Sequence, residues 1–118
     1  MAVYSKRLLS NSASGQQIKI SATSALGAPL LHAAVSGTAD LDEIWIWAQN
    51  SNSVGGKLTV EWGASQSPDD ELEITIPPES GYVLVVPGLL LNNSASVRAF
   101  AASANLFMIN GYVNRITA

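Results

Sequence analysis

Apolar and polar residues alternate along much of the chain with a period of two. In residues 57–63 the apolar Leu58, Val60 and Trp62 are separated by polar residues, and residues 71–76 repeat the pattern. This alternation is typical of β-strands with one buried and one solvated face, as in antiparallel sheets. No segment has a clear 3.6-residue period. The pattern therefore predicts an all-β protein.

Turn-forming residues divide the chain at short intervals. Clusters of Gly, Pro, Asn, Asp and Ser occupy, for example, residues 50–56, 65–70 and 77–81. Several short strands separated by turns favour an antiparallel β-sandwich of the jelly-roll type, with residues 16–118 as its single domain. About eight strands are expected, at residues 16–22, 30–35, 42–49, 57–63, 71–76, 81–86, 95–102 and 106–115.

The N-terminal segment, residues 1–15, has a different pattern. It begins with Tyr4, Leu8 and Leu9 around a basic pair and continues as a Ser, Asn, Ala and Gly run. Two interpretations are open: an extra edge strand, or an arm that reaches a neighbouring subunit. Because large apolar side chains gain nothing from a frayed terminus, we expect the segment to be docked.

Two segments are apolar on both faces. Residues 44–48 alternate Ile with Trp, and residues 82–86 are apolar throughout. Such strands are covered on both faces or lie at an interface between molecules. The expected oligomer-interface residues are Trp45, Trp47, Tyr82, Leu84 and Val86.

The composition strengthens the interface interpretation. The 118 residues are 47% hydrophobic and 13% charged, against a usual charged share of about 25%. Fifteen Ser, eight Asn and five Thr supply neutral polar surface, and 40 residues are apolar and larger than Ala. A well-filled monomer core is one explanation. A homo-oligomer is favoured, because the centres of such interfaces are apolar and poor in charge.

Charge is segregated along the chain. All nine acidic residues lie between Asp40 and Glu79, where Lys57 is the one basic residue, whereas the flanking segments hold five Lys and Arg residues. One explanation is that each block of like charge forms an ordinary solvated face. The alternative is a polar molecule that docks one end on an oppositely charged partner.

Several kinds of chemistry lack the residues that they need. Without Cys there is no thiol nucleophile, disulfide or Cys-based zinc site. The sequence has one histidine, His32, and no nucleophile-elbow motif around any serine, so we expect His32 to have a structural role. Gly55-Gly56-Lys57 lacks the P-loop spacing. The pI of about 4.8 argues against nucleic acid, and no apolar run approaches the length of a membrane span or a signal peptide.

Two remaining clusters have weak functional interpretations. Asp69, Asp70 and Glu71 lack the spacing of a calcium loop and are interpreted as part of a turn, so no metal is expected. Trp45 and Trp47 leave three possibilities open: core, protein interface or a sugar-stacking surface. Trp62 falls on the inward face of its strand.

Much of the chain resembles small virion proteins of tailed bacteriophages. The likeness is carried by MAVYSKRLL (residues 1–9), DEIWIWAQN (42–50), LTVEWG (58–63), IPPESG (76–81) and GYVNR (111–115). The resemblance implies an antiparallel β fold, trimers or similar oligomers, and a place on the head surface as a decoration (cement) protein or head-fibre base. It implies neither catalytic residues nor a cofactor.

These expectations combine into one functional hypothesis. The protein is made in the bacterial host cytoplasm, forms a homo-oligomer, with a trimer expected, and decorates the capsid by binding the major capsid protein, with no role for nucleic acid or membrane. The expected capsid-contact residues are Tyr4, Lys6, Arg7, Leu8 and Leu9. The alternative is a carbohydrate-binding module of a head or tail fibre that uses Trp45 and Trp47. A small hydrolase is the least favoured possibility.

Overall fold

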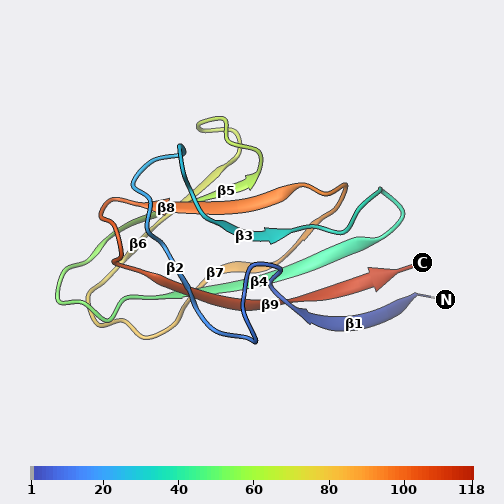
Figure 1. Ribbon diagram of the computed structural model, residues 1–118, viewed down its shortest axis with the longest axis horizontal. Helices are drawn as coiled ribbons and strands as arrows, with labels where there is room; N and C mark the ends of the chain where they lie inside the picture. The colour runs from blue at the N-terminus through green and yellow to red at the C-terminus, as the bar shows by residue number, and fades with distance from the viewer. Residues whose placement is uncertain (1) are drawn as a thin grey trace.

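Two antiparallel β-sheets face each other in the computed structural model, which describes residues 2–118 (Figure 1). Met1, the first residue of the expected N-terminal segment, lies outside this range. All regular elements of the described chain are strands, so the expected all-β class is confirmed. The strands are β1 (Val3–Leu8), β2 (Ile18–Lys19), β3 (Leu30–Ala33), β4 (Leu41–Gln49), β5 (Gly56–Gly63), β6 (Glu71–Ile76), β7 (Val83–Leu91), β8 (Ser96–Ala101) and β9 (Met108–Thr117).

The strand pairing is that of a jelly roll. The first sheet has the order β1-β9-β4-β7, with β2 also pairing with β9, and the second sheet has the order β3-β8-β5-β6. Strands pair in a nested series, β2 with β9, β3 with β8, β4 with β7 and β5 with β6. A long hairpin rolled across two sheets produces this series, so the expected fold is confirmed.

The N-terminal segment forms an edge strand. Residues Val3–Leu8 pair antiparallel with the last residues of β9, from Val3 opposite Thr117 to Leu8 opposite Tyr112. Both termini therefore lie together at one end of the molecule (Figure 1). Of the two interpretations of this segment, the edge strand is the one that the structure shows.

Strand β7 is longer than expected, because Pro87-Gly88 does not end it. The strand runs on to Leu91. It is an edge strand, where a proline is tolerated although it lacks the N–H that donates to a neighbouring strand. Its register against β4 shifts on either side of the pair Trp45-Ile46. Gly88 has a φ of +73°, which a glycine adopts without strain. The expected end of this strand at residue 86 was therefore wrong.

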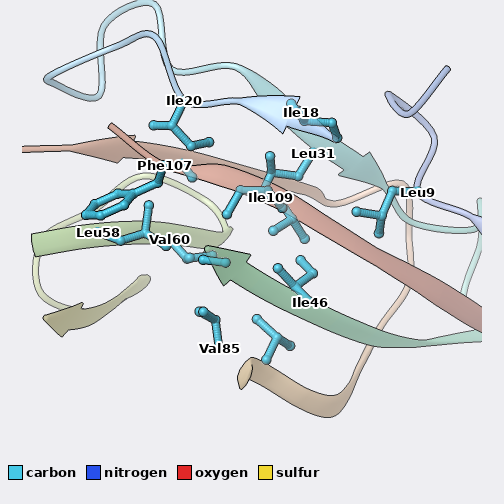
Figure 2. Close-up of a cluster of buried hydrophobic side chains, with 14 of the residues drawn as sticks. Leu9, Ile18, Ile20, Leu31, Ile46, Leu58, Val60, Val85, Phe107 and Ile109 are labelled. Atoms are coloured by element: carbon cyan, nitrogen blue, oxygen red, sulfur yellow. The ribbon is translucent and has the colours of Figure 1, made fainter. Parts of the chain in front are cut away.

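The core lies between the sheets and receives side chains from both (Figure 2). Ile44, Ile46 and Ala48 of β4 are fully buried, as are Leu58 and Val60 of β5, as the period-two pattern predicts. Trp62 is partly buried against the same cluster. Phe107 fills the region just before β9, where it is the largest fully buried side chain.

Candidate interaction face

The outer face of the first sheet carries a row of stacked aromatic rings. Since Ile44, Ile46 and Ala48 point into the core, Trp45 and Trp47 point outward. In the register of β4 with β9, Tyr112 lies directly opposite Trp45. The ring centroids are 6.1 Å apart for Trp45–Trp47, 6.4 Å for Trp45–Tyr112 and 6.0 Å for Trp47–Tyr112, with interplanar angles of 17–26°. These offset-stacked rings form one rigid aromatic cluster.

Neighbouring residues hold this cluster in place. The Trp45 indole Nε1–H donates to Glu43 Oε1 at 2.9 Å, and the same ring covers Gly88, where an added Cβ would lie 2.6 Å from Trp45 Cζ2. The Lys6 ammonium lies 5.2 Å from the centroid of the Tyr112 ring, within the range of a cation–π interaction. Gly88 of β7 and Lys6 of β1 therefore contact the aromatic cluster from opposite sides.

Exposed apolar side chains extend the cluster across the sheet. On the β7 side, Tyr82 and Leu84 are 51% and 42% exposed, and on the β1 side Tyr4 is 64% exposed. The alternation of β1 against β9 places Tyr4, Lys6 and Leu8 on the same side as Tyr112. We call this surface the aromatic face; its residues are Tyr4, Lys6, Leu8, Trp45, Trp47, Tyr82, Leu84 and Tyr112.

The two sets of residues expected to form separate contacts lie mostly on this single face. Of the expected capsid-contact set, Tyr4, Lys6 and Leu8 are on it. Of the expected oligomer-interface set, Trp45, Trp47, Tyr82 and Leu84 are on it.

Three expected residues lie elsewhere. Leu9 follows β1 and is 1% exposed, and Val86 is fully buried opposite Ile46, so neither is available for a surface contact. Both side chains belong to the core cluster. Arg7 alternates with Lys6 and is opposite the inward-facing Val113, so its exposed side chain does not share the aromatic face.

Tyr112 is the residue that the sequence interpretation missed. It is separated from Trp45 by 67 positions in the chain, and only the β4–β9 register brings the two rings together. The available signal was the alternation Asn110, Tyr112, Asn114, which marks a second strand with polar and aromatic residues outward.

A hollow lies at one end of the aromatic face. Trp47, Tyr82, Asn110, Gly111 and Tyr112 line a space of about 330 Å³. The Tyr82 hydroxyl donates to Gln17 Oε1 at 2.7 Å, and the Gln49 side-chain amide donates to the same oxygen. The hollow thus has aromatic walls and the side-chain amide of Asn110, and the hydrogen bond to Gln17 fixes the orientation of Tyr82.

His32 belongs to a buried polar network between the sheets. Its Nδ1 accepts the Ser10 backbone N–H at 2.9 Å, so Nε2 carries the proton and donates to Asp42 Oδ2 at 2.8 Å. Arg115 donates to both carboxylate oxygens of Asp42, at 2.8 and 3.0 Å. Burial raises the pKa of Asp42, but the hydrogen bonds from Arg115 and His32 outweigh burial and leave it lowered. The network ties β3 of one sheet to β4 and β9 of the other.

The acidic turn has a local structural role. The Asp70 carboxylate accepts the Gln66 backbone N–H at 3.1 Å, and the Asp70 carbonyl accepts that of Trp62 at 2.7 Å. Within residues 2–118, no three His, Asp or Glu side chains are grouped so as to hold a metal ion.

Comparison of the chain with protein-family models, curated proteins and solved structures finds no match. The described part of the chain contains no helix long and apolar enough to cross a membrane. The aromatic face is therefore the surface from which a function is inferred.

Proposed function

We propose that this protein is a non-enzymatic structural protein of a tailed-phage virion, which forms a homo-oligomer and decorates the capsid surface. The observation that carries the proposal is the aromatic face, a continuous exposed surface of stacked rings and aliphatic side chains on an otherwise complete sandwich. The phage context comes from the sequence resemblance and from the jelly-roll topology, which recurs in viral capsid proteins.

The chemistry of the aromatic face suits a protein–protein contact. Trp and Tyr dominate the energetically important positions of interfaces, and large apolar patches on monomers mark interaction sites. Four strands about 4.8 Å apart and up to ten residues long cover roughly 19 × 33 Å. This projected area of roughly 600 Å² is of the order of the 800 Å² that each partner buries in a standard interface.

The face offers two strips for two contacts. The strip formed by Trp47, Tyr82 and Leu84 consists of uncharged side chains and suits contact between copies of the chain. The strip on β1, with Tyr4 and Leu8 around Lys6, adds a positive charge and suits the major capsid protein. Many copies, each burying a modest surface, would then attach by summed contacts.

A matched pair of leucine variants tests the self-association. Leu84→Ser, on the aromatic face, is expected to shift the oligomer toward monomer by at least tenfold in dissociation constant, measured by sedimentation velocity. Leu26→Ser is the control, because Leu26 is 91% exposed on a loop outside the face. Equal behaviour of the two variants would remove the aromatic face as the interface.

Co-expression with the neighbouring gene product tests the capsid contact. If a major capsid gene lies beside this gene, its assembled particles should retain the protein in a sucrose gradient, and Lys6→Gln should weaken that retention. Lys57→Gln is the control, since Lys57 lies on the second sheet and pairs with Glu73. Retention that is indifferent to Lys6, or absent with the unmodified chain, contradicts the capsid contact.

Carbohydrate binding is the second candidate, and the hollow beside Tyr82 favours it. Sugars stack on aromatic rings and hydrogen bond to amides, and both kinds of group line this space. A glycan array should then give signals that disappear in Trp47→Ala. If the unmodified chain binds no glycan and Trp47→Ala loses the oligomer, carbohydrate binding is rejected in favour of the structural role.

A further inference from the structure

A buried carboxylate lies on the other sheet, far from the aromatic face in the strand order. Glu61 of β5 alternates with the core residues Val60 and Trp62, so it belongs to the outer side of its sheet, yet it is only 2% exposed. Its Oε2 has no hydrogen-bond partner among residues 2–118. Buried polar atoms are nearly always paired, and an exception calls for an explanation such as a water, an ion or a ligand.

Two loops bury Glu61 and leave a cavity beside it. The loop between β2 and β3 passes over β8 (Figure 1) and is attached there, with Ala101 N–H donating to Ala22 O at 3.0 Å and Arg98 Nη1 donating to Ala28 O at 3.1 Å. The loop that follows β5 closes the other side. The cavity has a volume of about 250 Å³ and is lined by Ala25, Glu61, Ala64, Ser65, Ser96 and Arg98.

The charged neighbours of Glu61 leave its carboxylate without an ion pair. Arg98 and Glu71 are its direct partners on the two adjacent strands. No basic group in residues 2–118 forms a salt bridge with Glu61. Burial raises the pKa of Glu61 most, Glu71 raises it further, and Arg98 lowers it less than Glu71 raises it. Burial without an ion pair therefore disfavours the charged form of this carboxylate, and a cation bound in the cavity would offset that cost.

We propose that the cavity binds a small primary alkylammonium ion, with Glu61 as its counter-ion. An ammonium group has three N–H donors, which match the Glu61 carboxylate and the hydroxyls of Ser65 and Ser96. The methyl groups of Ala25 and Ala64 provide apolar wall for a chain of a few carbons. A divalent metal fits poorly, since Ca²⁺ takes six to eight oxygen ligands and the cavity lining offers one carboxylate and two hydroxyls.

The test is a titration of the folded protein with n-propylammonium chloride, followed by ¹H–¹⁵N NMR at constant ionic strength. Saturating shifts are expected for Ala25, Ser65, Ser96 and Arg98, with the aromatic face unaffected. Tetramethylammonium carries the charge without N–H donors and should bind at least tenfold more weakly. Equal response to tetramethylammonium or sodium chloride, or saturation by the neutral polyol glycerol, would overturn the assignment.

Glu61→Gln and Glu73→Gln form the matched pair of variants. Glu61→Gln removes the counter-ion and is expected to weaken n-propylammonium binding at least tenfold. Glu73 lies on the same sheet, is about half exposed and pairs with Lys57, so Glu73→Gln should bind as the unmodified chain does. Unchanged binding in Glu61→Gln refutes the proposal. If that variant fails to fold, the comparison of the two ammonium ions on the unmodified chain decides. Neither result depends on whether the chain forms oligomers or decorates capsids.

Discussion

Replacing Asp42 by Asn should destabilise the fold through the network that joins the two sheets. The Asp42 side chain is fully buried and accepts four hydrogen bonds. Oδ1 accepts from Arg115 Nε, whereas Oδ2 accepts from His32 Nε2, Val35 N and Arg115 Nη2. An asparagine has one oxygen and one NH₂ group, so in either orientation it places a donor against at least one donor. The better orientation keeps the oxygen at the Oδ2 position and opposes the Arg115 Nε–H.

The magnitude follows from those contacts. A hydrogen bond to a charged group contributes about 1.5–3 kcal/mol, and breaking a buried charged pair costs about 3–5 kcal/mol. The Arg115 side chain is 22% exposed, so water relieves part of the loss. We expect Asp42→Asn to lower the free energy of unfolding by about 3 kcal/mol, a large part of the 5–15 kcal/mol typical of a domain.

Urea unfolding followed by tryptophan fluorescence measures this loss. Asp69→Asn is the control, because it makes the same chemical change at an exposed turn position, where substitutions stay within about 0.5 kcal/mol. A loss below about 1 kcal/mol for Asp42→Asn would refute the interpretation of the network as the main polar link between the sheets.

Three further predictions concern the same fold. The folded pKa of Asp42 lies below its ordinary value of 3.8, so the stabilisation that Asp42 provides is complete above the unfolded pKa and is lost as the pH falls through the folded pKa. The difference in unfolding free energy between the unmodified chain and Asp42→Asn should therefore shrink below about pH 3.8. A difference that stays constant with pH would contradict this. Gly88→Ala should cost about 1–3 kcal/mol and change the near-ultraviolet circular dichroism of the stacked tryptophans, since its φ is +73° and its Cβ would meet Trp45; an unchanged spectrum and stability would show that the ring moves freely. Phe107→Ala should cost about 3–5 kcal/mol in urea unfolding, because it empties the largest fully buried site; a loss under 1 kcal/mol would place Phe107 outside the core.

Alternation within single strands was the part of the fold that the sequence could predict. It correctly separated Leu58 and Val60 from Lys57 and Glu61, because side-chain direction in a strand depends only on position parity. It failed at Pro87-Gly88, where the chain continues as an edge strand with a register shift. The shift depends on the partner strand, which local sequence does not specify.

The candidate site could be predicted only in part, because it too depends on which strands pair. Trp45 and Trp47 stood out as a pair with three open interpretations, and Tyr4 and Lys6 as part of an unusual N-terminal segment. That all four share one face with Tyr112 depends on the order β1-β9-β4, which brings together segments from both ends of the chain. Glu61 was expected to be solvated, and it is buried because two loops outside the strand pattern cover it.

The oligomeric state in solution tests the central claim most directly. Sedimentation velocity of the full chain at micromolar concentration should give one discrete oligomer, about 37 kDa for a trimer of the 12.4 kDa chain. Its Leu84→Ser variant should dissociate while Leu26→Ser does not. A single species of 12.4 kDa across the micromolar range would contradict the account, because the aromatic face would then be exposed on a stable monomer.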